Sequence, residues 1–399
     1  MYIIHRLHPM PAVIDLNRIL YNRRSFAPQQ QGAPDEYTAD RAKNIVTSAQ
    51  QAKSCGVFTT GGIGDHLFDI PFFWSLRHSY PHMHILDITM QPKVASLCLK
   101  AGLVDRVVVV SNPREPGADL KRRQIRFLLE TLQLRCLQLD LSIFLATGLT
   151  SKLALWQACV GARCRVATGP SIVKNHRWLD YIEPGSATHH IDQDLVLAES
   201  LGCDTSNALM SFQEVFAQYI RERAGEGGVF IHPFLMDYTR DGRRWSLRNF
   251  QAVHEYLDQC GIEPVVLGTE RELSRPELRA WPNLKTATLS SLEDSARLLA
   301  GARLVIGNDS AVVHLASLLG SPALCVMGSS DPYNTRPYFG GGVARIELPC
   351  SPCFSKKGFL TCNHFSCVER LSPDLVIAHP LVQELFSGTR ITRQAPGGP

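Results

Sequence analysis

A glycine-rich turn in the first third of the chain ends in a carboxylate that could act as a general base. The turn reads Gly61-Gly62-Ile63-Gly64-Asp65 and lies where a predicted strand passes into a predicted helix. Glycine lets a ligand approach the outward-facing backbone N–H groups of such a turn closely. Asp65 could take a proton from a bound substrate, or it could only cap the helix that follows. Both interpretations of Asp65 stay open on these residues alone.

A dinucleotide-binding fingerprint is the rival interpretation of the same turn. In its favour, Asp87 ends the next predicted strand, about where a ribose-binding acid would lie. Against it, Leu67 stands where G-x-G-x-x-G requires its third glycine, and the Asp65 carboxylate would repel a pyrophosphate. The turn therefore argues against a nicotinamide oxidoreductase.

A second helix start, in the C-terminal half, favours an anion. The segment runs Gly307-Asn308-Asp309-Ser310-Ala311 and continues to His314-Leu315-Ala316. We expect Asn308 or Asp309 to cap the helix, whose free N–H groups and positive dipole end attract negative charge. Ser310 adds a hydroxyl, and His314 lies four residues later on the same helical face. A core histidine with satisfied hydrogen bonds is the alternative for His314.

An arginine-rich loop precedes this segment. It reads Tyr238-Thr239-Arg240-Asp241-Gly242-Arg243-Arg244-Trp245. The planar guanidinium of arginine suits phosphate oxygens and stays charged at any working pH. An ordinary solvated loop would also be basic, so the loop supports a phosphate site only together with other features.

Four of the 12 cysteines fall within one short stretch: Cys350, Cys353, Cys362 and Cys367. Their spacing suits tetrahedral coordination by four thiolates, with zinc or iron as the metal. Four protein ligands leave no open position, so we expect a structural metal. A disulfide or a chance grouping is the alternative, and the absence of an export signal disfavours it.

Predicted strands and helices alternate along the chain, which indicates an α/β fold with parallel sheets covered on both faces. Strands are expected at residues 57–59, 84–88, 106–110, 137–144, 164–167, 229–232, 264–268, 304–307 and 323–328. We predict an N-terminal extension (1–52), two Rossmann-like domains (53–225 and 226–388) and a flexible tail (389–399). The second domain includes the cysteine-rich loop, residues 349–368.

Composition excludes several classes of protein. Lys and Arg total 41 against 37 Asp and Glu, a net charge of +4. This balance is too even for a protein whose main partner is the nucleic-acid backbone. Few basic residues surround the four cysteines, which disfavours a nucleic-acid-binding finger. No apolar run reaches the ~18–20 residues of a membrane span, and Met1–Asn17 lacks the pattern of a secretory signal. We expect a cytoplasmic protein with at most peripheral contact at the inner face of a membrane.

Three of these segments together resemble glycosyltransferase family 9, the ADP-heptose–lipopolysaccharide heptosyltransferases and their relatives. They are residues 61–71, residues 239–245, and residues 308–316 with Gly328 and Asp331-Pro332. Each match is weak alone, but their order and their places on the expected elements make the resemblance specific. It covers roughly Val57 to Val376.

The resemblance implies a GT-B fold, in which the second domain binds the nucleotide of the donor and the first binds the acceptor. It implies that Asp65 is the general base, next to the glycines Gly61, Gly62 and Gly64. Thr239 and Arg243 would hold the diphosphate, although the family usually has lysine where Arg243 stands. Asp309 would contact the donor sugar, and Ser310 and His314 would lie at the helix terminus beside the diphosphate.

The function implied is inverting sugar transfer without a catalytic metal or other cofactor. The favoured donor is ADP-heptose, and the acceptor is a hydroxyl of a lipopolysaccharide-type glycan or of a protein. Some relatives that modify autotransporter proteins carry a similar cysteine cluster with a structural metal. Two alternatives stay open: a non-catalytic GT-B scaffold or sugar-nucleotide sensor, and a GT-B enzyme that uses a UDP-sugar.

Overall fold

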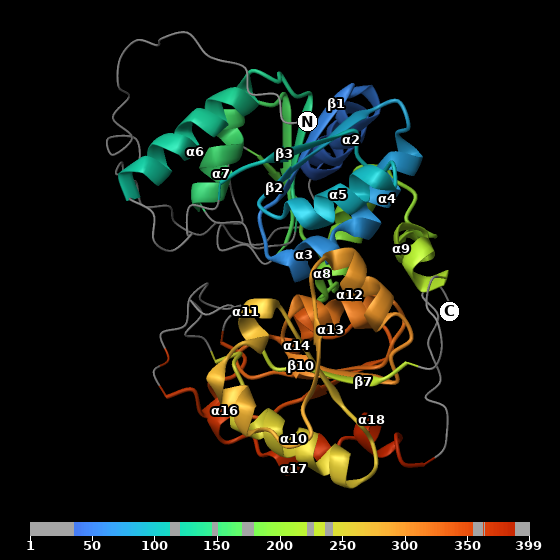
Figure 1. Ribbon diagram of the computed structural model, residues 1–399. Helices are drawn as coiled ribbons and strands as arrows, with labels where there is room; N and C mark the ends of the chain where they lie inside the picture. The colour runs from blue at the N-terminus through green and yellow to red at the C-terminus, as the bar shows by residue number, and fades with distance from the viewer. Residues whose placement is uncertain are drawn as a thin grey trace. The chain divides into compact units, whose positions relative to one another are not determined.

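The computed structural model describes residues 36–111, 120–145, 151–169, 179–221, 227–235, 242–353, 362 and 364–387 (Figure 1). The chain divides into two compact units, Met1–Arg41 and Ala42–Pro399. The second unit holds, within the described residues, two parallel β-sheets that alternate with helices. Among the described helices, none combines the length and apolarity that a bilayer span requires.

The first sheet has the strand order β3-β2-β1-β4-β5-β6, and every pairing in it is parallel. Its central strands are buried on both faces, as expected of a parallel sheet covered by helices. The strands are β1 (Ser54–Thr59), β2 (His84–Thr89), β3 (Arg106–Val109), β4 (Leu141–Phe144), β5 (Cys164–Ala167) and β6 (Asp180–Tyr181).

Helices connect these strands and cover the sheet. They are α2 (Glu36–Gln51), α3 (Ile63–Phe68), α4 (Ile70–Ser79), α5 (Pro92–Lys100), α6 (Leu120–Arg135), α7 (Ser151–Val160), α8 (His190–Ser200), the 3₁₀ helix η1 (Ala208–Met210) and α9 (Ser211–Arg221). Ile45 and Ala49 of α2 are buried among the core residues of the first sheet. Part of the segment predicted as an extension therefore contributes to the core.

The second sheet has the strand order β12-β11-β10-β7-β8-β9, again with parallel pairings. Its strands are β7 (Val229–His232), β8 (Val265–Gly268), β9 (Lys285–Thr288), β10 (Leu304–Asn308), β11 (Ala323–Val326) and β12 (Gly341–Ala344). Counted from its own first strand, each sheet has the order 3-2-1-4-5-6. Ligands of such sheets bind where the winding reverses, which here lies between β1 and β4 and between β7 and β10.

The second half has its own set of helices. They are α10 (Leu247–Gln259), α11 (Glu270–Leu273), the 3₁₀ helix η2 (Pro276–Ala280), α12 (Leu292–Leu299), α13 (Ala311–Leu318), α14 (Pro332–Thr335), α16 (Ser366–Glu369), α17 (Pro373–Ile377) and α18 (Pro380–Gln383). Trp245 and Phe250 are fully buried in the core on one side of this sheet. An edge-to-face contact between their rings, with centroids 4.8 Å apart, anchors α10 there.

The predicted α/β class with two parallel sheets is confirmed. The proposed junction between the domains at residues 225 and 226 and the tail at 389–399 lie outside the described residues. The same holds for residues 354–361 and 363 of the cysteine-rich loop. The domain limits therefore stay predictions.

Candidate active site

The glycine-rich turn leaves β1 at the point where the first sheet reverses its winding. Helix α3 begins at Ile63, with Gly62 before it and Asp65 in its first turn. Asp65 Oδ2 accepts a hydrogen bond of 2.7 Å from the Gly62 N–H, so this carboxylate supports the helix end, as one of the two interpretations expects. The Asp65 side chain is 37% exposed. A substrate can therefore still reach the carboxylate.

Gly64 brings this turn against the second half of the chain. A Cβ atom at residue 64 would lie 2.9 Å from His314 Cδ2 and 3.6 Å from the Cα of Ala311. Helix α3 accordingly packs against α13 (Figure 1). The residue before Asp65 thus touches the first turn of the helix that was predicted to hold an anion.

The start of α13 lies at the reversal point of the second sheet. Ser310 occupies the N-cap position but its side chain makes no capping bond, so the expected cap by Asn308 or Asp309 is wrong. The Ser310 hydroxyl instead lies 3.1 Å from Nδ1 of His232, the last residue of β7. Burial lowers the pKa of His232 to about 4, so this ring is neutral near pH 7. With no side-chain cap, the first N–H groups of α13 can receive an anion.

Asp309 is a buried carboxylate with both oxygens engaged. Oδ1 lies 3.0 Å from His314 Nε2, and Oδ2 accepts a hydrogen bond from the Ser330 hydroxyl. Burial opposes ionisation of Asp309, but the contact with His314, the hydroxyl of Ser330 and the charge of Arg243 outweigh it and hold its pKa below the usual range. Asp309 is therefore ionised at neutral pH and fixes the His314 ring.

Asn308 joins the arginine loop to the second sheet. Its Oδ1 accepts a hydrogen bond of 2.8 Å from the Trp245 N–H, and its Nδ2 donates one of 2.8 Å to the Pro233 carbonyl. The end of this loop is thereby fixed beside the start of α13. Arg243 is partly exposed, and its charge acts on Asp309. Thr239, the other predicted phosphate ligand, lies outside the described residues.

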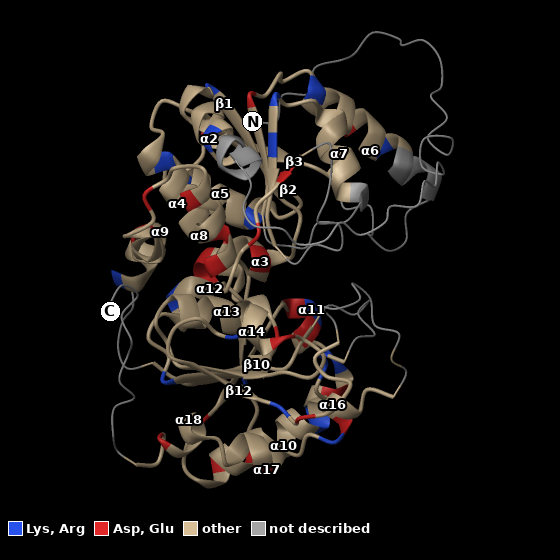
Figure 2. Cartoon of the chain, turned by 180° about the vertical axis from the view of Figure 1, so that it is seen from behind, with Lys and Arg blue, Asp and Glu red and all other residues tan. Residues whose placement is uncertain are grey.

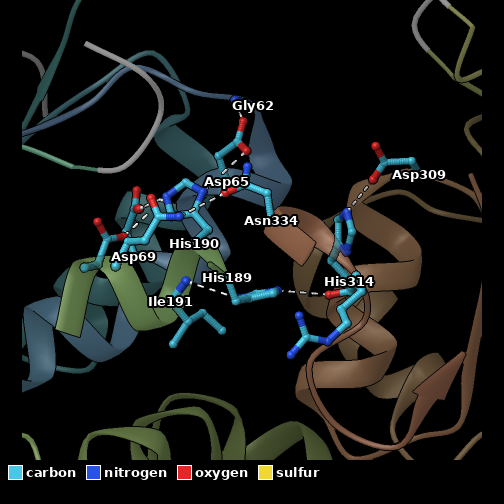
Figure 3. A network of polar contacts seen from close by, with 12 residues as sticks. Gly62, Asp65, Asp69, His189, His190, Ile191, Asp309, His314 and Asn334 are labelled. Carbon is cyan, nitrogen blue, oxygen red and sulfur yellow. Dashed lines mark hydrogen bonds and ion pairs between the residues drawn. The ribbon is translucent and has the colours of Figure 1, made fainter. Parts of the chain in front are cut away.

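A buried histidine that the sequence did not single out lies behind Asp65 (Figure 3). His190 Nε2 is 3.2 Å from Asp69 Oδ1 and 3.3 Å from Asp194 Oδ2, and its Nδ1 is 3.8 Å from Asp65 Oδ1. Asp65 lies on α3, Asp194 on α8, and Asp69 at the junction of α3 with α4. Red segments mark acidic residues at α3 and α8 in Figure 2.

Asp69, His190 and Asp194 shift one another's pKa. Burial raises the pKa of Asp69 to about 7, with a further upward contribution from Asp194. For His190, burial disfavours the charged ring, but Asp194 and Asp69 outweigh it and raise the pKa well above its ordinary value. His190 is therefore an imidazolium near neutral pH.

Two groups of side chains have the residue types of metal ligands. Within the described residues, a single set of three ligating side chains has its atoms within 4.8 Å of one another, and it is Asp69, His190 and Asp194. His190 Nε2 is hydrogen-bonded to Asp69 Oδ1 at 3.2 Å and lies within ion-pair distance of Asp194 Oδ2, at 3.3 Å, so we assign an ion-pair network. No three of the predicted cysteine ligands, all of them described residues, have their sulphur atoms that close together.

The four cysteines are nevertheless near neighbours. Burial raises the pKa of the Cys367 thiol to about 11, and Cys353, Cys362 and Cys350 each add to the increase. Cys367 Sγ lies 3.7 Å from the Gly242 carbonyl oxygen, and Cβ atoms at Gly242 and Gly328 would lie 2.9 and 3.1 Å from that sulphur. Two glycines thus leave space for Cys367. All 12 cysteines, each within the described residues, are free thiols.

Comparison with known proteins places the chain in a family. The sequence model described as "Glycosyltransferase family 9 (heptosyltransferase)" matches residues 140–364, more than half of the chain. The chain belongs to glycosyltransferase family 9. The predicted family is therefore confirmed, and with it a heptosyltransferase-like protein.

Relatives and solved structures of the family agree with this assignment. The chain is 28% identical over 152 residues to lipopolysaccharide heptosyltransferase 1 of Escherichia coli (strain K12), a match over 37% of this chain and 44% of that protein, less than half of its length. E. coli heptosyltransferase WaaC with ADP-2-deoxy-2-fluoro heptose superposes with a TM-score of 0.59 at 17% identity, covering 84% of this chain and 100% of that one.

A third similar protein carries iron. It is the dodecameric iron-containing heptosyltransferase TibC in complex with ADP-D-beta-D-heptose, with a TM-score of 0.50, 13% identity, and coverage of 84% of this chain and 77% of that chain. At these sequence identities, the similarity to the WaaC and TibC structures shows the fold alone. The predicted GT-B arrangement of this family 9 member is confirmed.

The structure brings most of the predicted site residues of this family 9 member together. Gly64 contacts His314, His314 contacts Asp309, and the charge of Arg243 reaches Asp309. Sequence reasoning missed His232, Asp69, His190 and Asp194. A usable signal existed only in part: Asp65 and Asp69, like His190 and Asp194, are spaced by four residues, so each pair shares a helical face.

Proposed function

We propose that this protein transfers heptose from ADP-heptose to a hydroxyl of a lipopolysaccharide-type glycan, with inversion at the anomeric carbon. The observation that carries the proposal is the contact of Gly64 with His314. It puts an accessible carboxylate from the first half beside a helix start from the second half that suits a diphosphate. Transfer from a nucleotide sugar needs both groups in one site.

Asp65 acts as the general base in this proposal. Its carboxylate takes the proton of the acceptor hydroxyl while the acceptor oxygen bonds to the anomeric carbon and the bond to the diphosphate breaks. Because Oδ2 is tied to the Gly62 N–H, the carboxylate has a defined orientation, which general base catalysis requires.

The second half stabilises the leaving diphosphate. The first N–H groups of α13, the hydroxyl of Ser310 and the guanidinium of Arg243 supply donors and positive charge where negative charge develops. Thr239 keeps its predicted role as a further phosphate ligand. Asp309 fixes the His314 ring and faces the donor sugar. No catalytic metal is part of this mechanism.

The comparisons support the donor and the acceptor class. The similar solved structure of WaaC is described with an ADP-heptose analogue, and the matched E. coli relative is named for lipopolysaccharide. A protein acceptor is the other outcome that the test below can return. The free thiols support the reducing cytoplasm as the place of action.

A structural metal at the four cysteines is a separate part of the proposal. The chemistry of the donor set suits a metal, because the other three cysteines act on the charge of the Cys367 thiol and Gly242 and Gly328 leave room around it. Cys350, Cys353, Cys362 and Cys367 would hold zinc or iron, and TibC is described as iron-containing. The metal would stabilise the loop beside Gly242 and would take no part in sugar transfer.

Transfer assays test the proposal directly. The purified protein is incubated with ADP-heptose, UDP-sugars or GDP-sugars and with either heptose-deficient lipopolysaccharide or candidate acceptor proteins, and the products are followed by mass spectrometry. We expect glycan modification with ADP-heptose and a thermal shift with ADP. Binding of a nucleotide sugar without transfer to any acceptor would favour the sensor alternative.

A further inference from the structure

His190 is an ionisable group beside Asp65 for which the mechanism above has no use. It begins α8, its side chain is 1% exposed, and its two ring nitrogens face different carboxylates (Figure 3). Nε2 contacts Asp69 and Asp194, and Nδ1 faces Asp65 Oδ1 at 3.8 Å, within ion-pair range. The ring therefore lies between a buried pair of carboxylates and an accessible one.

The surroundings of His190 favour the ring with a proton on each nitrogen. Asp194 faces it from α8 itself, Asp69 from the junction of α3 and α4, and Asp65 from α3. The adjacent His189 does not compete with His190 for the proton, because burial lowers the pKa of His189 to about 3. Its Nε2 lies 3.0 Å from the Arg336 carbonyl oxygen. Phe68, whose ring centroid is 5.6 Å from that of His190, closes the apolar side.

We propose that His190 is a positioning residue that holds the Asp65 carboxylate in place for proton transfer. Asp69 and Asp194 anchor Nε2, so Nδ1 presents a fixed positive charge to Oδ1 while the Gly62 N–H holds Oδ2. A carboxylate offers about four acceptor positions, so two stay available for the acceptor hydroxyl. This inference rests on the proposed role of Asp65 as the base.

A stability cycle tests the contact without any turnover. Unfolding of the full chain by urea is measured for wild type, Asp65→Asn, His190→Gln and the double variant. We expect the shifts in midpoint to be non-additive. His254→Gln is the matched control, because His254 is also fully buried but lies on α10, against Trp281. Its cycle with Asp65→Asn should be additive. Additivity in the His190 cycle would overturn the inference.

Kinetics test the consequence for the reaction. His190→Gln should lower kcat about 10–100-fold and leave the donor KM within about twofold, because the nucleotide lies in the second half. Asp194→Asn should lower kcat by a smaller factor, because Asp69 still anchors the His190 ring. If His190→Gln does not fold, the double variant His190→Gln/Asp194→Asn is used in its place in both experiments. This double variant removes one positive and one negative charge, so no buried charge is left without its partner. An unchanged kcat in either variant that lacks His190 would contradict the positioning role.

The two experiments also separate this inference from the proposed function. A wild-type protein that transfers no sugar to any acceptor refutes the function, while the stability cycle still decides whether His190 holds Asp65. A wild-type enzyme with full activity and an additive cycle keeps the function and removes the inference.

Discussion

Gly64 and His314 lie so close that residue 64 has no space for a side chain. The Cβ of any other residue would approach His314 Cδ2 to 2.9 Å, while the adjacent ring nitrogen, Nε2, is held by Asp309. Movement of the ring would therefore disturb a buried hydrogen bond. The requirement for glycine at this position comes from the contact between the two halves.

Gly64→Ala should consequently weaken both stability and transfer. We expect a loss of about 1–3 kcal/mol in the free energy of unfolding from overpacking, and a lower kcat because His314 and Asp65 shift. Gly62→Ala in the same turn is the control, since its Cβ would meet only Asp65 Oδ2, at an ordinary 3.4 Å. Equal effects of the two substitutions on urea midpoint and kcat would contradict this explanation.

Asp65→Asn should fold and bind ADP like wild type but transfer sugar at least about 100-fold more slowly, because the amide cannot accept the proton. Circular dichroism and a thermal shift with ADP provide the controls for folding and nucleotide binding. Turnover near the wild-type rate would show that another group is the base.

His314→Ala should reduce the part of the unfolding free energy that the protein loses when the pH falls. The folded-state pKa of Asp309 lies below its ordinary value, so its contribution to stability is present above about pH 4 and is lost as the pH falls through the folded value. Without His314 this contribution shrinks. We expect the variant to be about 1–3 kcal/mol less stable at pH 7 and the gap to narrow at pH 3, as measured by urea unfolding.

Asp69→Asn should act in the opposite sense. The pKa of Asp69 is raised to about 7 in the folded protein, so its contribution to stability is present below about pH 4 and is lost as the pH rises to about 7. Because asparagine cannot ionise, the variant does not lose this part of the unfolding free energy as the pH rises. Between pH 5 and pH 8, the variant should therefore lose less unfolding free energy than wild type. A parallel decline of both proteins would argue against the raised pKa.

Cys350→Ser/Cys353→Ser should remove a bound metal and lower the melting temperature, with nucleotide binding affected only through the loop beside Gly242. Metal content is measured by elemental analysis of the purified proteins. Cys136→Ser/Cys260→Ser, which changes two exposed thiols outside the cluster, is the control and should leave the metal in place. Wild-type protein without zinc or iron would remove the metal from the proposal.

Local signals predicted the elements better than they predicted the site. Strand β7 has the predicted bounds, Val229–His232, because a short apolar run follows Gly227-Gly228 and ends before Pro233. The N-cap of α13 was assigned wrongly because Asn308 turns back to Trp245 and Pro233, a tertiary contact that no local rule contains. The same reason hid His190, whose partner Asp69 is 121 residues away in the chain.

Each half of the molecule winds a complete sheet of its own, and the two windings are alike. A substitution in the loops at the edge of one sheet need not disturb the strand pairing of the other sheet. Specificity for the acceptor can then change between related proteins while specificity for the nucleotide sugar is kept. Hybrids assembled from the halves of two relatives should inherit these specificities separately.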